Sequence, residues 1–138
     1  YMAADPVLVE NTKAWLAKAA KDLRRVEQLI SAEEPDYEDA VFHCQQSVEK
    51  ALKAFLTWHD QPFRKTHDID ALGRQCTPID PTLDALVDKA DRLTEYAWLY
   101  RYPGDADEPT VGDVEESCKV ASEVLRAILD RLPVEVRP

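Results

Sequence analysis

The chain has 138 residues, of which 17 are Lys or Arg and 27 are Asp or Glu, so its formal net charge is −10. This length suits a single domain, and a hydrophobic fraction of 45% is enough for one buried core. The acidic balance argues against a protein that coats nucleic acid nonspecifically, because the phosphate backbone would be repelled. No apolar run is long enough to span a membrane and the N-terminus lacks a signal-peptide pattern, so we expect a cytoplasmic protein.

The N-terminus begins with Tyr1 before Met2. We interpret Tyr1 as a residue appended in cloning and expect one domain over residues 2–138.

Four long stretches, 16–30, 37–58, 83–100 and 114–132, repeat apolar residues alternately every three and four positions. This spacing predicts four amphipathic helices. A short apolar segment at 69–72 predicts a small additional helix, and prolines between the stretches predict helix ends. No stretch alternates with a period of two, so a sheet has no support. The predicted fold is an all-α, up-down bundle of four long helices plus a short one.

Polar residues at the starts of these stretches predict helix caps. Asp36 precedes the second stretch, and Thr110 stands three residues before Asp113 at the start of the last. Asp80 followed by Pro81 predicts the start of the fourth helix, with proline at its first position.

Cysteine and histidine spacing gives no metal motif. The three cysteines form no Cys-x-x-Cys pair and are predicted to be reduced core residues. His43 and His59 are too far apart for a paired helical metal motif, so we expect no metal and no cofactor.

The second stretch carries polar residues beside its apolar stripe. Gln45, Glu49 and Lys53 follow one another at intervals of four and share a face, as do Gln46 and Lys50. Such pairs are typical of a solvated helix face, and the alternative is a polar groove where this helix meets another helix. Residues 49–67 include four basic and two acidic residues, a net charge of +2 in an acidic chain, which favours anion recognition.

Aromatic residues could stack on nucleobases, but at helical spacing they are more typical of a core or a dimer surface. These aromatic residues are Trp15, Trp58, Tyr96, Trp98 and Tyr100.

Three polar motifs occur together in a fixed order: Cys44-Gln45-Gln46 continuing through Glu49-Lys50-Ala51-Leu52-Lys53-Ala54, then Thr66-His67-Asp68-Ile69, then Arg101-Tyr102-Pro103. From about residue 14 to residue 132 the chain resembles the HEPN family, the "higher eukaryotes and prokaryotes nucleotide-binding" domain. The resemblance implies a bundle of four or five helices, often a homodimer, frequently encoded beside a minimal nucleotidyltransferase in prokaryotic toxin–antitoxin or defence modules.

Many members of that family are metal-independent ribonucleases that carry an Arg followed four to six residues later by a His. In such a site the Arg clamps a phosphate while the His moves a proton. The matching residue here is Arg101, but no histidine follows it, and residues 105–116 contain six acidic residues and no basic one.

We therefore predict a noncatalytic module without catalytic residues. The resemblance assigns the binding of a nucleotide, of a nucleotidyltransferase partner or of RNA to a set of six residues: Gln45, Glu49, Lys53, His67, Arg101 and Tyr102. The alternative is a ribonuclease toxin with a rearranged site in which Arg101 and His67 act on RNA. A third possibility is a dimeric scaffold without a small-molecule site.

Overall fold

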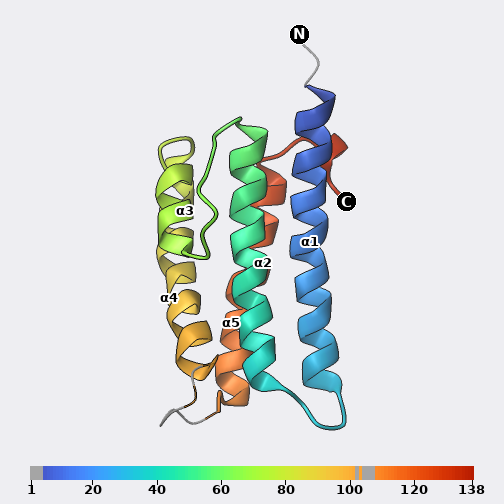
Figure 1. The fold of residues 1–138 in the computed structure, drawn as a ribbon, viewed down its shortest axis with the longest axis vertical. Helices are drawn as coiled ribbons and strands as arrows, with labels where there is room; N and C mark the ends of the chain where they lie inside the picture. The colour runs from blue at the N-terminus through green and yellow to red at the C-terminus, as the bar shows by residue number, and fades with distance from the viewer. Residues whose placement is uncertain (1–4, 102, 104–107) are drawn as a thin grey trace.

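The computed structural model describes residues 5–101, 103 and 108–138 of the chain, and these form an all-α bundle (Figure 1). The helices are α1 (Pro6–Ser31), α2 (Tyr37–Trp58), α3 (Ile69–Cys76), α4 (Asp84–Arg101) and α5 (Val111–Asp130), with 3₁₀ turns η1 (Pro81–Leu83) and η2 (Val134–Val136). The four long helices alternate in direction, as predicted, and the short α3 lies beside the first half of α4. None of the helices in the described ranges combines the length and the apolar character needed to cross a membrane.

Two predicted caps are confirmed and one is displaced. The Asp36 carboxylate accepts a hydrogen bond from the Asp39 amide at 3.0 Å, and Thr110 and Asp113 form a reciprocal capping box. Asp80 does not begin the fourth long helix. It caps η1 instead, where its carboxylate accepts from the Thr82 amide at 3.0 Å and from the Arg131 guanidinium at 2.8 Å, and α4 begins at Asp84, directly after η1.

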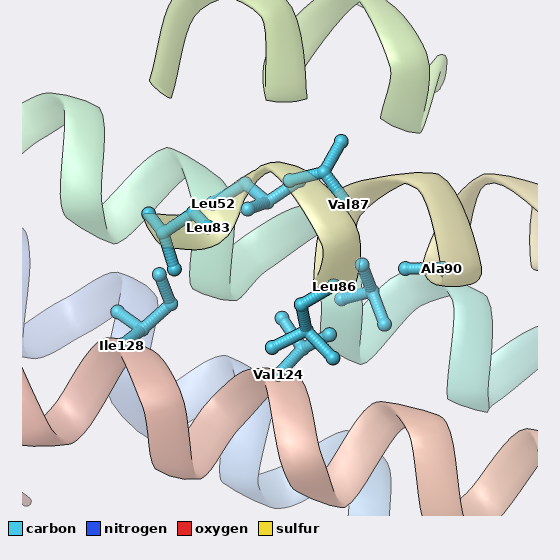
Figure 2. Close-up of a pocket in the computed structure, with 8 residues that line it drawn as sticks. Leu52, Leu83, Leu86, Val87, Ala90, Val124 and Ile128 are labelled. Carbon is cyan, nitrogen blue, oxygen red and sulfur yellow. The ribbon is translucent and has the colours of Figure 1, made fainter. Parts of the chain in front are cut away.

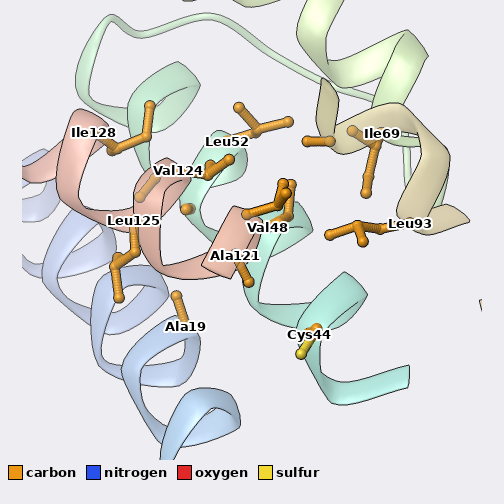
Figure 3. Close-up of a cluster of buried hydrophobic side chains, with 14 of the residues drawn as sticks. Ala19, Cys44, Val48, Leu52, Ile69, Leu93, Ala121, Val124, Leu125 and Ile128 are labelled. Carbon is orange, nitrogen blue, oxygen red and sulfur yellow. The ribbon is translucent and has the colours of Figure 1, made fainter. Parts of the chain in front are cut away.

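The core lies around α2, which contacts each of the other four helices. Figure 3 shows Val48 and Leu52 of α2 among side chains from α3, α4 and α5. Each fully buried aliphatic side chain of this size contributes roughly 1.5–3 kcal/mol relative to an exposed one. The apolar stripe predicted for α2 is therefore the centre of the bundle.

The buried face of α1 differs from the predicted one. Leu29 is buried and Ile30 is exposed, and Asp22, not Leu23, completes the buried row with Ala19 and Val26. Leu16, Ala19 and Val26 of the predicted stripe are buried and Leu23 is partly buried, and Asp22 is buried beside polar partners on α2, as described below.

The segment after α2 folds back along the same helix. The helix ends in a Schellman motif, in which the Asp60 amide bonds the Thr57 carbonyl and the Gln61 amide bonds the Leu56 carbonyl. Asp60 takes the left-handed conformation that this motif requires, with φ of 53°. Segment 59–68 then descends beside α2 before α3 begins (Figure 1).

A small void remains between α2, η1, α4 and α5 (Figure 2). Its volume is about 10 Å³, and all its lining side chains are apolar, including Leu52, Leu86 and Val124. A space of this size and character is a packing defect, since it offers a water molecule no polar partner. The candidate site must be sought on the surface.

Candidate functional site

The candidate site is built around Glu49, a carboxylate in the middle of α2 whose side chain is only 2% exposed. Four hydrogen bonds converge on its two oxygens. Oε1 accepts from Lys53 Nζ at 3.1 Å and from His67 Nδ1 at 2.8 Å, and Oε2 accepts from Gln45 Nε2 at 3.1 Å and Gln46 Nε2 at 3.2 Å. A buried charge is stable only when it is paired and hydrogen-bonded in this way. We call these five residues the Glu49 cluster.

The cluster attaches segment 59–68 to α2. Gln45 Nε2 also donates to the His67 carbonyl at 3.1 Å, so the backbone and the side chain of His67 are both bonded to α2. Further along, Gln75 of α3 donates to the Pro62 carbonyl at 2.9 Å. Residues 22 positions apart in the sequence are thereby held in direct contact.

The His67 side chain is oriented by this arrangement although it is 72% exposed. A carboxylate can only accept, so His67 Nδ1 carries a proton toward Glu49. The other ring nitrogen, Nε2, is left to accept a proton in the neutral ring or to donate one in the cationic ring. The imidazole can therefore contact an anion or move a proton.

Of the six residues predicted from the sequence, the structure brings together Gln45, Glu49, Lys53 and His67. Gln45, Glu49 and Lys53 are buried, so they do not form a solvated helix face, and His67, which bonds Gln45 and Glu49, belongs to the non-helical segment 59–68. Arg101 is the last residue of α4, which ends at the lower end of the bundle, while segment 59–68 lies beside the upper half of α2 (Figure 1). The side chain of Arg101, and Tyr102 as a whole, lie outside the described residues.

A shallow groove adjoins the Glu49 cluster on the side of α1. It is lined by Trp15, Lys53, Phe63, Lys65, Thr66 and His67. Sequence reasoning treated Trp15 as a core or interface aromatic and did not consider Phe63. The sequence does point to Phe63, because this aromatic residue lies inside the basic segment 62–67.

A second buried carboxylate, Asp22 of α1, was also missed. Its oxygens accept from His43 Nδ1 at 2.8 Å and from Lys50 Nζ at 2.6 Å, both on α2. The signal was that Asp22 interrupts an apolar row at helical spacing, which requires a polar partner on the facing helix. This network joins α1 to α2 and is part of the scaffold of the groove.

The cysteines carry no disulfide in this structure. Cys44 and Cys76 are buried and Cys118 is half-buried. A hydrogen bond from the Cys44 thiol, assisted by Ser122, lowers the pKa of Cys118 to about 6, whereas burial raises the pKa of Cys76 to about 12. Within the described ranges, no group of three or more His, Cys, Asp or Glu side chains could hold a metal ion.

The protein is thus an antiparallel helical bundle that carries a buried polar cluster on its second helix. The HEPN domain model matches residues 12–132, and the chain belongs to the HEPN domain family.

Two relatives resemble most of the chain. A protein of Methanocaldococcus jannaschii named "Putative toxin MJ1304" is 30% identical in an alignment that covers 90% of this chain and 90% of that protein. The crystal structure of TT1696 from Thermus thermophilus superposes with a TM-score of 0.76 at 28% identity, covering 88% of this chain and 98% of that one.

Proposed function

We propose that this chain is the HEPN component of a toxin–antitoxin-type system and acts as a noncatalytic module that binds a nucleotide at the groove beside His67. The toxin name of the archaeal relative and the family match support the system. The family resemblance implies a minimal nucleotidyltransferase as the partner and a homodimer as the working form.

One observation carries the assignment of the site. The buried Glu49 carboxylate fixes the exposed His67 ring at the edge of a groove that also carries Lys65, in a chain whose net charge is −10. A fixed imidazole beside an ammonium group suits a phosphate, because both can donate hydrogen bonds to its oxygens.

Nucleotide binding is tested by isothermal titration of the purified protein with ATP, GTP, CTP and UTP in turn. His67→Asn is the informative variant, since the Asn amide can still donate to Glu49 in place of Nδ1 but offers nothing in place of Nε2. We expect at least a tenfold loss of affinity in His67→Asn. The matched control, Lys119→Ala, removes an exposed cation on α5 and should bind as the parent protein does. Absence of binding to all four nucleotides would refute the proposal.

A ribonuclease is the second candidate, and the orientation of His67 favours it. A carboxylate that holds Nδ1 and leaves Nε2 at the surface is an arrangement that enables an imidazole to act as a general base. In this alternative His67 takes the proton of a ribose 2′-hydroxyl and Arg101 contacts the phosphate.

The two candidates are separated by incubating a structured RNA with the protein in EDTA, beside the Arg101→Ala and His67→Asn variants. We expect no cleavage products. Cleavage by the parent protein that disappears in both variants would establish the ribonuclease and refute the noncatalytic module.

A further inference from the structure

The thiols of Cys44 and Cys118 meet between α2 and α5. These two long helices contact each other and run in the same direction (Figure 1). Cys44 is the eighth residue of α2 and Cys118 is the eighth residue of α5, so the two cysteines stand at the same level of the bundle. The Cys44 thiol donates a hydrogen bond to the Cys118 sulfur. Two sulfur atoms from distant parts of the chain are thus already in contact.

Small side chains on both helices surround this thiol pair. Ala40 lies one turn before Cys44 on α2, and Ser117 and Ala121 flank Cys118 on α5. All three small side chains are buried. A disulfide needs Cα atoms that are about 4.4–6.8 Å apart, and bulky neighbours on both helices would oppose such a close approach. The hydrogen-bonded thiols and their small neighbours therefore suit a covalent link between α2 and α5.

The two thiols differ in exposure and in ionisation. Cys118 is half-buried, and hydrogen bonds from Cys44 and then from Ser122 stabilise its thiolate and lower its pKa to about 6. Because the thiolate is the nucleophilic form of cysteine, Cys118 is reactive near neutral pH. Cys44 is fully buried, and the hydrogen bond to Cys118 and then burial raise its pKa, so it stays protonated. A reagent from solvent therefore meets Cys118 first, with the Cys44 thiol directly behind it.

Cys76 provides a contrast within the same chain. Its side chain is 0% exposed, and its thiol donates a hydrogen bond to the Leu52 carbonyl at 3.9 Å. Burial raises its pKa to about 12. Cys76 therefore has neither an ionised sulfur nor access to solvent, and it serves as an internal reference for any reaction at Cys118.

We propose that Cys118 is a site of oxidation by a hydroperoxide and that Cys44 converts the oxidised group into a disulfide between α2 and α5. In the first step the Cys118 thiolate attacks the peroxide. The O–O bond breaks, the sulfur is oxidised by two electrons to a sulfenic acid, and hydroxide or alkoxide leaves. In the second step the Cys44 sulfur attacks the Cys118 sulfur, the S–S bond forms, and the Cys44 proton leaves with the sulfenic hydroxyl as water. A dithiol reverses the change by thiol–disulfide exchange and is itself oxidised to a disulfide.

The test uses the whole chain, reduced with dithiothreitol, freed of the reductant and treated with a small excess of hydrogen peroxide at neutral pH. Peptide mass spectrometry without reduction should show the peptides of Cys44 and Cys118 joined, with Cys76 still a free thiol. Thiol titration in denaturant should fall from three free thiols per chain to one. Dithiothreitol should restore all three thiols.

Three variants assign the two roles. Cys44→Ala and Cys76→Ala are matched, because each replaces a fully buried thiol by a small apolar side chain. In Cys44→Ala the sulfenic acid at Cys118 has no thiol to react with, so dimedone should trap it. In Cys76→Ala the disulfide should form as in the parent protein. In Cys118→Ser the remaining two thiols should stay free, with oxidation slowed by about tenfold or more.

Three results would overturn the proposal. A disulfide between two copies of the chain through Cys118, seen as a dimer on a non-reducing gel, would remove the role of Cys44. Sulfinic acid at Cys118 in the parent protein, with Cys44 still a free thiol, would remove it as well. Oxidation of Cys118 no faster than that of Cys76 would refute the site itself. None of these measurements depends on the groove beside His67, so the proposed function is tested separately.

Discussion

Replacement of Glu49 by Gln is the most informative single change in this protein. All four side-chain groups around the carboxylate are hydrogen-bond donors, two to each oxygen. A Gln side chain has nearly the same shape, but its amide nitrogen would point at donors whichever way the amide is turned. Two of the four hydrogen bonds are therefore lost, and Lys53 stays buried without an anionic partner.

The size of the effect follows from that geometry. Removing one partner of a buried ion pair costs about 3–5 kcal/mol, because the remaining charge is left uncompensated. Single domains are stable by only about 5–15 kcal/mol, so Glu49→Gln should fold but be much less stable. At roughly 2–4 °C per kcal/mol, the melting temperature should fall by about 6–20 °C.

A double-mutant cycle with Lys53→Met separates the ion pair from general damage to the core. Thermal and urea unfolding of the parent, both single variants and the double variant give the coupling energy. We expect the double variant to be less destabilised than the sum of the singles by about 1–3 kcal/mol, since it leaves no unpaired ammonium. A cost below about 1 kcal/mol for Glu49→Gln, or strict additivity, would refute the view that the buried Lys53 ammonium depends on the Glu49 carboxylate for its compensating charge.

Three further predictions concern packing and ionisation. A Cβ at Gly73 would overlap Val87 Cγ1, so Gly73→Ala should lower the urea-unfolding free energy by about 1–3 kcal/mol, and adding Val87→Ala should recover part of it. Because the pKa of Cys118 is lowered to about 6, iodoacetamide in mildly alkaline buffer should modify Cys118 well before Cys76, as peptide mass spectrometry would show; equal labelling would contradict this. Desolvation, followed by the charges of four nearby carboxylates, raises the pKa of Asp91, so the ionised Asp91 side chain destabilises the fold. Asp91→Asn should therefore raise the melting temperature at neutral pH, and this gain should vanish as the pH falls through the raised pKa. An equal gain in strong acid would contradict this explanation.

Much of the fold could be predicted because its determinants are local. Three-four spacing and proline positions identify the four long helices and their alternation, and the caps at Asp36 and Thr110 depend on residues three positions away. The errors arose where distant residues intervene. Asp22 of α1 is buried against His43 and Lys50 of α2, and Asp80 pairs with Arg131, 51 residues further along the chain; neither contact follows from local spacing.

The candidate site, like the fold, could be predicted only where its determinants are local. The shared face of Gln45, Glu49 and Lys53 follows from intervals of four on one helix. Burial of that face could not be predicted, because it requires segment 59–68 to fold back and cover it. Gln46 illustrates the difference, since its spacing suggested a pair with Lys50, whereas in the structure Gln46 bonds Glu49 and Lys50 reaches across to Asp22.

The shared acceptor, Glu49 Oε1, links ligand binding to the docking of segment 59–68. An anion at His67 Nε2 favours the protonated ring, and a protonated ring strengthens the Nδ1–Glu49 hydrogen bond that holds the segment. Linkage requires the reverse as well: docking of the segment raises the affinity for the ligand by the same factor by which the bound ligand stabilises docking. We therefore predict that a bound nucleotide slows amide hydrogen exchange in residues 59–68, and that Glu49→Gln loses both the protection and the affinity. Nucleotide binding at full affinity in Glu49→Gln would show that the groove does not depend on the cluster beneath it.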